Sequence, residues 1–425
     1  MYKINVKTDK ILNNKLYHTK LDNGLSVFVF PQKNFSKSIG MFGTKYGSID
    51  RACNILDGKE SKIPDGVAHF LEHKLFEQEE ANALDLFSQI GMNANAYTSY
   101  DHTVYYFETT KEIEKGIKTL IKLVRTPYFT EQNVEKEKGI IAQEINMYND
   151  EPGFQAYMTV LKELYKKHPI SIDIAGSVDS IQNITKDTLY ECYNNFYNLD
   201  NMFFIVVGDV VPEDVIKIIN EELKKYKVNN NENIKKVEIK DEDKVEYKEI
   251  NKKMNVYMPI ITYGFKLKPK NGLESLKEKL VISIIESMYF SKLSKFYEEM
   301  YDKNIIDIPL DLSYESGKNY AILLLTAQTK EKEKIKICIN NYLKEINTKK
   351  FDKELFENVK KEKYGDLIYS YDNIDTFWRE AIMQELFDIP VFSAIEMLNN
   401  ITEEDIKKTL IEAFQNSDMV MSIID

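Results

Sequence analysis

Two histidines and a glutamate form the segment His69-Phe-Leu-Glu72-His73. Residues four apart on a helix share one face, so both imidazoles would project together with Glu72 beside them. Neutral imidazole nitrogens are good zinc ligands, and a carboxylate that does not bind the metal can take a proton from an activated water. This H-x-x-E-H order is the reverse of the H-E-x-x-H motif of other zinc peptidases. The motif therefore predicts a zinc peptidase, with His69 and His73 as ligands and Glu72 as general base.

The alternative is an ordinary amphipathic helix that carries two surface histidines. The whole chain has five histidines, so a chance match to the motif is uncommon. Pro64-Asp65-Gly66 supplies a turn before the predicted helix, and an apolar stripe accounts for the helix but not for the histidines. A zinc site also needs a third protein ligand, so the motif predicts one elsewhere in the chain.

A second predicted helix, over residues 130–150, carries the candidate third ligand. Thr130 is a suitable N-cap, acidic residues fill the first turn, and Pro152 follows the end. Glu137 and Glu144 share one face of this helix. Glu144 is the candidate ligand. Glu137 is placed to accept a hydrogen bond from the ring N–H of a ligating histidine. The helix is rich in Glu and Lys, and spacing alone does not distinguish Glu144 from a surface glutamate.

The combined spacing of these residues resembles the pitrilysin/insulinase family of zinc peptidases. Residues 95–107, 168–177 and 204–209 also resemble landmarks of that family, densely in the N-terminal half and weakly in the C-terminal half. The chain is most similar to the smaller bacterial members that are like the mitochondrial processing peptidase. The resemblance implies one Zn²⁺ on His69, His73 and Glu144, with Glu72 as general base and Glu137 supporting a ligand.

Length and composition narrow the class of protein. A chain of 425 residues fits two domains of about 200 residues each. The net charge of −11 argues against a nucleic-acid partner. Three cysteines far apart predict neither a disulfide framework nor a second metal site. The N-terminus lacks the apolar core of a secretory leader, and no run is long enough to span a membrane, so we expect a cytoplasmic protein.

Three sequence pairs recur at an offset of 217 residues and indicate an internal duplication. Tyr46-Gly47 recurs as Tyr263-Gly264, Ile184-Thr185 as Ile401-Thr402, and Met202 as Met419. The expected division is a catalytic domain over residues 1–228, a linker over 229–243 and a second domain over 244–425. Strand-like runs at 25–30, 104–108 and 203–207 alternate with helical patterns, which predicts an α/β fold. At the same offset the H-x-x-E-H motif falls on residues 286–290, which contain no histidine.

The family resemblance adds detail to this α/β (α+β) fold. It implies two homologous domains, each a mixed sheet of about six strands backed by helices, that face each other as a clam shell. A substrate peptide would bind as an added β-strand, because main-chain pairing tolerates many sequences. Residues 93–99 fit the pairing edge, because the small residues among them let another backbone approach closely. The resemblance implies that Asn95 and Ala96 contact the substrate, whereas their sequence alone favours a plain edge strand.

One departure from the family bears on partners. Active members carry an Arg and a Tyr seven residues apart that help to hold substrate, but residues 294–307 contain no Arg. Tyr297, Tyr301 or Lys295 would have to replace the pair, or another chain would supply it. We expect the second: a heterodimer with a related zinc-free subunit, or otherwise a homodimer. The alternative function is a non-proteolytic scaffold or binding subunit with the same fold.

Overall fold

The structure is a computed structural model that describes residues 3–54, 60–79, 82–227, 235–237, 239, 241 and 244–425. The chain divides into two compact units. Unit 1 comprises Met1–Ile145, Ile172–Val237 and Tyr371–Leu386, and unit 2 comprises Asn146–Ser171, Glu238–Ser370 and Phe387–Asp425. The units are not contiguous in sequence. Residues 146–171 follow unit 1 segments but belong to unit 2, and residues 371–386 follow unit 2 segments but belong to unit 1. Most of the expected linker, 229–243, lies outside the described residues.

Unit 1 contains a seven-stranded mixed sheet in the order β1-β2-β3-β9-β4-β8-β7. Its strands are β1 (Asn5–Thr8), β2 (Lys15–Lys20), β3 (Ser26–Pro31), β4 (Ser38–Thr44), β7 (Asn93–Thr98), β8 (Thr103–Thr109) and β9 (Met202–Gly208). The strands expected at 25–30, 104–108 and 203–207 are therefore confirmed. β3 and β9 pair in parallel at the centre, and every residue of β9 is buried. A strand covered on both faces needs such a continuous apolar run.

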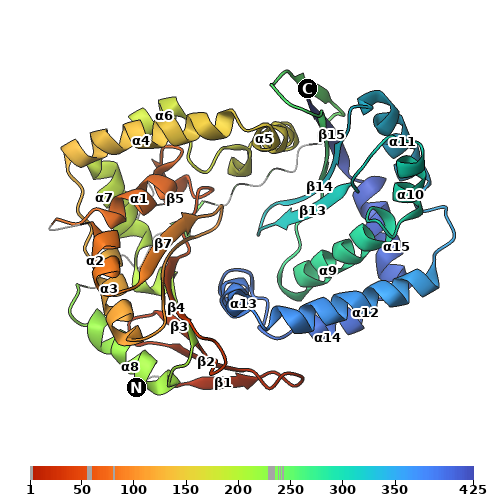
Figure 1. Ribbon diagram of the computed structural model, residues 1–425. Coiled ribbons are helices and arrows are strands. Elements are labelled where there is room, and N and C mark those ends of the chain that lie inside the picture. The colour runs from red at the N-terminus through yellow and green to blue at the C-terminus, as the bar shows by residue number, and fades with distance from the viewer. Residues whose placement is uncertain are drawn as a thin grey trace. The chain divides into compact units, whose positions relative to one another are not determined.

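Helices cover one face of this sheet around a single apolar core (Figure 1). They are α1 (Val67–Phe76), α2 (Ala83–Gln89), α3 (Ile113–Arg125), α4 (Glu131–Asn149), α6 (Val178–Gln182), α7 (Lys186–Phe196) and α8 (Pro212–Leu223), with the 3₁₀ turn η2 (Leu199–Asn201). Val27 and Val29 of β3 point into this core, so Phe28 and Phe30 face the other side. There α13 (Ile374–Phe387) supplies Phe377, whose ring centroid lies 5.5 Å from that of Phe30.

Unit 2 repeats this arrangement with a five-stranded mixed sheet in the order β11-β15-β12-β14-β13. Its strands are β11 (Glu249–Lys252), β12 (Ile260–Lys266), β13 (Asp311–Ser316), β14 (Ala321–Gln328) and β15 (Asp418–Ile424). One face is covered by α9 (Gly272–Tyr289), α10 (Lys295–Asp302), α11 (Lys332–Glu345), α12 (Lys353–Ser370), α14 (Ala394–Asn399) and α15 (Glu403–Phe414). The two mixed sheets confirm the expected α/β fold, with seven and five strands where about six were expected in each.

The segment 146–171 supplies the helix on the other face of the unit 2 sheet. This helix, α5 (Pro152–Leu164), packs on β12 and β15 and is followed by η1 (Pro169–Ser171). Gly264 of β12 permits the close approach, because a Cβ there would lie 2.0 Å from Cγ1 of Val160. The duplication thus includes a reciprocal exchange: α5 follows α4 but completes unit 2, and α13 follows α12 but completes unit 1.

The capping residues of the repeated elements agree with the duplication. Thr185 and Thr402, which were paired in the sequence, are the N-caps of α7 and α15. Met202 begins β9, and Met419 is the second residue of β15.

A small additional sheet in the order β10-β5-β6 joins Lys235–Lys236, Ala52–Asn54 and Glu60–Lys62.

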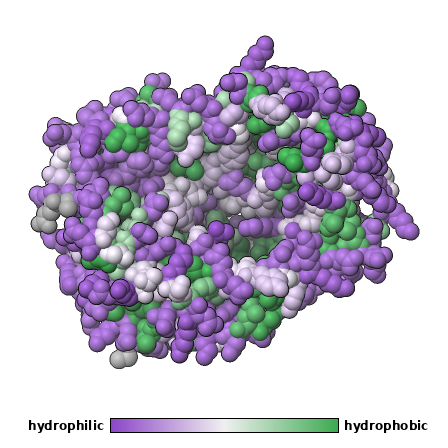
Figure 2. Space-filling model, in the orientation of Figure 1, coloured by the Kyte–Doolittle hydropathy of each residue, from purple (hydrophilic) through white to green (hydrophobic). Residues whose placement is uncertain are grey.

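Hydrophilic side chains dominate the face of the molecule drawn in Figure 2, and apolar side chains occur there in small separate groups. Single exposed apolar residues are normal for a folded protein. Within the described part of the chain, no helix has both the length and the apolar character needed to cross a membrane.

Candidate metal centre

The two histidines of the motif lie on α1, which begins directly after Gly66. Gly66 has a φ of +90°, and a Cβ there would lie 2.4 Å from the carbonyl oxygen of Ala175. Only glycine accommodates both the left-handed backbone and this contact without strain. Phe70 and Leu71 anchor α1 in the core, and the histidine rings lie with centroids 4.6 Å apart.

The helix α4 brings Glu144 to these imidazoles. Its first turn is capped as expected, since the backbone N–H of Asn133 donates to the Thr130 hydroxyl. Nε2 of His69 lies 3.7 Å from one carboxylate oxygen of Glu144, and Nε2 of His73 lies 3.6 Å from the other. The three residues offer donor atoms that all lie within 4.8 Å of one another. The structure therefore brings together three residues that could hold a metal ion.

The donor set fits zinc. The two Nε2–carboxylate distances are too long for hydrogen bonds. Tetrahedral zinc with ligand bonds of about 2.0–2.1 Å leaves neighbouring donor atoms about 3.4 Å apart, close to the separations found here. Two imidazoles and one carboxylate form the ligand set of catalytic zinc sites, in which a fourth position stays open for water or substrate.

The electrostatic surroundings of the two histidines also suit a metal. Burial, assisted by the neighbouring His73, lowers the pKa of His69 to about 3, which favours its neutral form. For His73 burial alone would lower the pKa, but the hydrogen bond with Glu137 and the surrounding carboxylates raise it instead. This crowding of carboxylates around His73 creates an electrostatic environment that favours a cation.

Glu137 lies beside His73, on the side of the ring away from Glu144. Its Oε1 lies 3.0 Å from Nδ1 of His73, which leaves Nε2 directed at Glu144. Burial alone would raise the pKa of Glu137, but the hydrogen bond with His73 and the charge of Lys74 outweigh it and lower the pKa. Lys74 was not singled out from the sequence. Its side chain is fully buried, forms an ion pair with Glu77 and lies 3.6 Å from Glu137.

Glu72 is buried beside the candidate metal ligands, and its carboxylate accepts a hydrogen bond from one hydroxyl. The Thr98 hydroxyl on β7 donates to Oε2 of Glu72 over 2.9 Å. Burial raises the pKa of Glu72, and only part of this effect is offset by the bond from Thr98. A carboxylate with a raised pKa is a stronger base than one in water. Thr98 lies in the predicted substrate edge but was not assigned a role from the sequence, because its contact with Glu72 depends on the fold.

Asn95 and Ala96 lie on β7, the last strand of the unit 1 sheet. The backbone N–H of Ala96 donates to the side-chain oxygen of Asn95 over 2.8 Å. The side chain of Asn95 thus satisfies a backbone N–H at the free edge of β7, where another strand could pair.

The residues considered as replacements for the Arg/Tyr pair lie on α10 of unit 2, where Tyr297 donates to the carbonyl of Asp307 and both Tyr301 and Lys295 are exposed.

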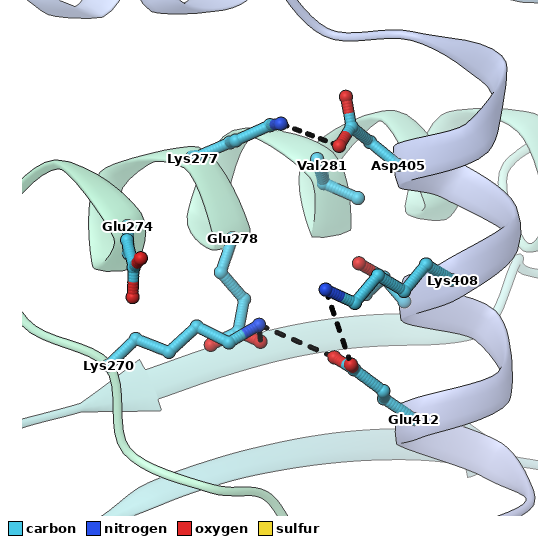
Figure 3. Close-up of a pocket in the computed structure, with 9 residues that line it drawn as sticks. Lys270, Glu274, Lys277, Glu278, Val281, Asp405, Lys408 and Glu412 are labelled. Carbon is cyan, nitrogen blue, oxygen red and sulfur yellow. Dashed lines mark hydrogen bonds and ion pairs between the residues drawn. The ribbon is translucent and has the colours of Figure 1, made fainter.

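Unit 2 also contains a polar cavity of about 210 Å³ between α9 and α15 (Figure 3). Lys270 pairs with Glu278 and Glu412, and Lys408 also faces Glu412. A further ion pair joins the two helices. Each lysine of the lining therefore has a carboxylate partner, and these ion pairs identify the cavity as part of the helix packing.

Comparisons with known proteins define the class. The sequence profile of the insulinase family (peptidase family M16) matches residues 58–177, and that of the peptidase M16 inactive domain matches residues 183–363. An uncharacterized zinc protease of Bacillus subtilis, YmfH, is 39% identical over 404 residues, which is 94% of each chain. The β subunit of the mitochondrial processing peptidase of Caenorhabditis elegans is 26% identical over 208 residues, covering 47% of this chain and 43% of that protein.

Solved structures agree with the sequence comparison. The crystal structure of an M16-like peptidase from Alicyclobacillus acidocaldarius superposes with a TM-score of 0.92 at 31% identity, covering 98% of this chain and 99% of that one. The chain therefore belongs to the insulinase family of peptidases, as its motifs predicted. The match to the profile of the inactive domain, residues 183–363, begins after the histidine motif and Glu144.

Proposed function

We propose that the chain is a zinc-dependent endopeptidase that hydrolyses peptides or small unfolded polypeptides. The observation that carries the proposal is the convergence of His69, His73 and Glu144 beside a buried carboxylate, Glu72. The relatives named zinc proteases support it. His69, His73 and Glu144 would hold one zinc ion.

Bound zinc would supply a Lewis acid that activates a water molecule for attack on a peptide carbonyl. The carboxylate of Glu72 takes the proton from that water and passes it to the leaving amine. Thr98 orients this carboxylate through Oε2 and leaves Oε1 to the reacting groups. Glu137 holds the proton of His73 at Nδ1, which keeps Nε2 free to bind a metal.

The substrate would pair with the free edge of β7, next to Thr98. The backbone of residues 93–98 offers the main-chain groups, and Asn95 would turn aside to release the N–H of Ala96. Such pairing fixes the scissile bond in an extended conformation. It explains how one site can accept many sequences.

We further propose that a second, zinc-free subunit of the same family completes the enzyme. The chain's arginines are Arg51, Arg125 and Arg379, so the region 294–307 has no arginine of its own. A relative that is named as one subunit of a processing peptidase supports an assembly of two chains.

The test combines metal analysis with cleavage of a peptide library by the chain alone and with a subunit co-purified from its native host. We expect about one zinc per chain, little cleavage alone and efficient cleavage in the complex. Glu72→Gln should retain zinc and lower kcat by roughly 10²- to 10⁴-fold. Glu131→Gln, at an exposed position on α4, is the control and should keep full activity. Zinc binding without cleavage in any complex would instead support a scaffold subunit.

A further inference from the structure

Arginine is scarce in this chain, and two of its arginines have partners within the fold. Arg51 forms an ion pair with Asp65, and Arg125 donates to two backbone carbonyls. Arg379 on α13 is exposed and has no ion-pair or hydrogen-bond partner among the described residues. Its guanidinium lies 5.2 Å from the ring of its neighbour, Trp378, the single tryptophan of the chain. Arg379 is thus a free cation held beside a flat aromatic surface.

The helix α13 packs on the face of the unit 1 sheet that is opposite to the metal site. Phe377 anchors it against Phe30, and Glu385 forms an ion pair with Lys45 after β4. Asp375 and Arg379 are four residues apart and therefore share one side of this helix. Arg379 is placed by its helix on the side of the sheet that the metal ligands do not occupy.

The strands β7 and β8 present polar side chains to the same face. Ala94 and Ala96 pack against the core of unit 1, so the alternate residues Asn95 and Tyr97 point to the side of α13. Asn95 pairs in register with Tyr106 of β8. Two tyrosines therefore lie on this face, at the free edge of the sheet and one strand inward.

The charges of two α13 residues also act on these tyrosines. Burial raises the pKa of Tyr97, and the positive charge of Arg379 opposes that rise. Burial also raises the pKa of Tyr106, and the charges of Glu108 and Asp375 add to it.

A peptide added to β7 would present alternate side chains to the two faces of the sheet. One set would face α1 and the metal site, and the other would face α13. Two lysines on this face are already neutralised, since Lys37 pairs with Glu108 and Lys45 with Glu385. With a net charge of −11 the chain as a whole repels acidic peptides, so a preference for them would need a local cation.

We propose that Arg379 is a specificity-determining residue that binds a carboxylate side chain of the peptide on the α13 face of β7. The inference rests on the proposed function, because it places the substrate on the β7 edge. The planar guanidinium can bind a carboxylate with two hydrogen bonds, and the ring of Trp378 would restrict its orientation. Acidic residues would be selected at alternate peptide positions, never at two adjacent ones.

The fluorescence of Trp378 measures this contact directly. Peptides of constant length, each with one glutamate at a different position, are titrated into the full chain carrying Glu72→Gln, which binds without cleaving. We expect tighter binding, roughly three- to fivefold, for glutamate at one position or at two positions separated by one residue. Arg379→Gln should abolish this preference, Arg379→Lys should retain part of it, and Arg379→Glu should shift it to lysine. Lys122→Gln on α3 removes an exposed charge on the other face and should change nothing.

The outcomes separate this inference from the proposed function. If the wild-type chain cleaves no peptide in any complex but the glutamate preference follows Arg379, the peptidase proposal fails and the binding site stands. If cleavage occurs but no peptide position depends on Arg379, the inference is overturned and the peptidase proposal stands. The absence of any peptide-dependent fluorescence change would also overturn the inference.

Discussion

At the level of single residues, the candidate metal group was selected from the sequence by helical spacing together with the family resemblance, which was needed to choose Glu144. His69 and His73 lie one turn apart on any helix, and Glu137 and Glu144 share a face of α4. The contacts of Lys74 and Thr98 were not predictable. Both depend on which elements pack against α1, and a lysine or threonine at those positions has no local signature of burial.

Glu137 provides a test of how the site is supported. Glu137→Ala removes the acceptor from Nδ1 of His73, so the imidazole loses its fixed orientation. We expect zinc affinity to fall by roughly 10- to 100-fold, and Glu137→Gln, which keeps an acceptor oxygen, to lose less. Competition with a metal chelator measures the affinity. Glu135→Gln, on the exposed side of the same helix, should leave the affinity unchanged.

His168 makes the stability of unit 2 depend on pH. Burial lowers its pKa to about 4, and its Nδ1 accepts the backbone N–H of Ile170, which requires an unprotonated nitrogen. Below pH 6.5 His168 is protonated in the unfolded chain but stays neutral in the folded chain. The free energy of unfolding should therefore fall between pH 6.5 and 4, by at most about 3 kcal/mol from this residue. His168→Asn keeps an acceptor and should reduce that slope in chemical denaturation. An identical slope in the variant would contradict the assignment.

At the level of elements, the sequence predicted the strands β3, β8 and β9 and the helices α1 and α4 from periodicity and caps. It did not predict the exchange of α5 and α13. Which helix covers the second face of a sheet depends on contacts between distant segments, and both helices have ordinary amphipathic patterns. The contiguous division at residues 228 and 244 reflects the repeat in the sequence, whereas the packing of unit 1 and unit 2 follows this exchange.

The docking of α5 on unit 2 can be tested at Gly264. Gly264→Ala places a methyl group against Val160, so we expect a loss of about 1–3 kcal/mol in the free energy of unfolding. Gly365→Ala is the matched control, because nothing lies within 4 Å of its Cβ position in α12. This second change should stabilise the protein by about 0.5–1 kcal/mol through helix propensity. Equal effects of the two substitutions would argue against close packing of α5.

For the whole molecule, the metal should link stability to zinc concentration. A proposed ion on His69, His73 and Glu144 would tie α1 to α4, and it binds the folded chain only. Zinc at 1,000 times its dissociation constant should stabilise the fold by about 4 kcal/mol. A chelator should therefore lower the melting temperature, and added zinc should restore it. His69→Ala should show little response to either treatment, which separates a specific site from loose binding of zinc to acidic residues.

The reciprocal exchange of α5 and α13 has a consequence for synthesis on the ribosome. The N-terminal sheet leaves Phe30 without its contact with Phe377 until residues 374–387 have been translated. The nascent half must therefore persist with an apolar surface that is open to chaperones or to aggregation. For the same reason, a truncated product that ends before α13 would retain every residue of the metal group. It would lack the helix that covers the opposite face of the sheet.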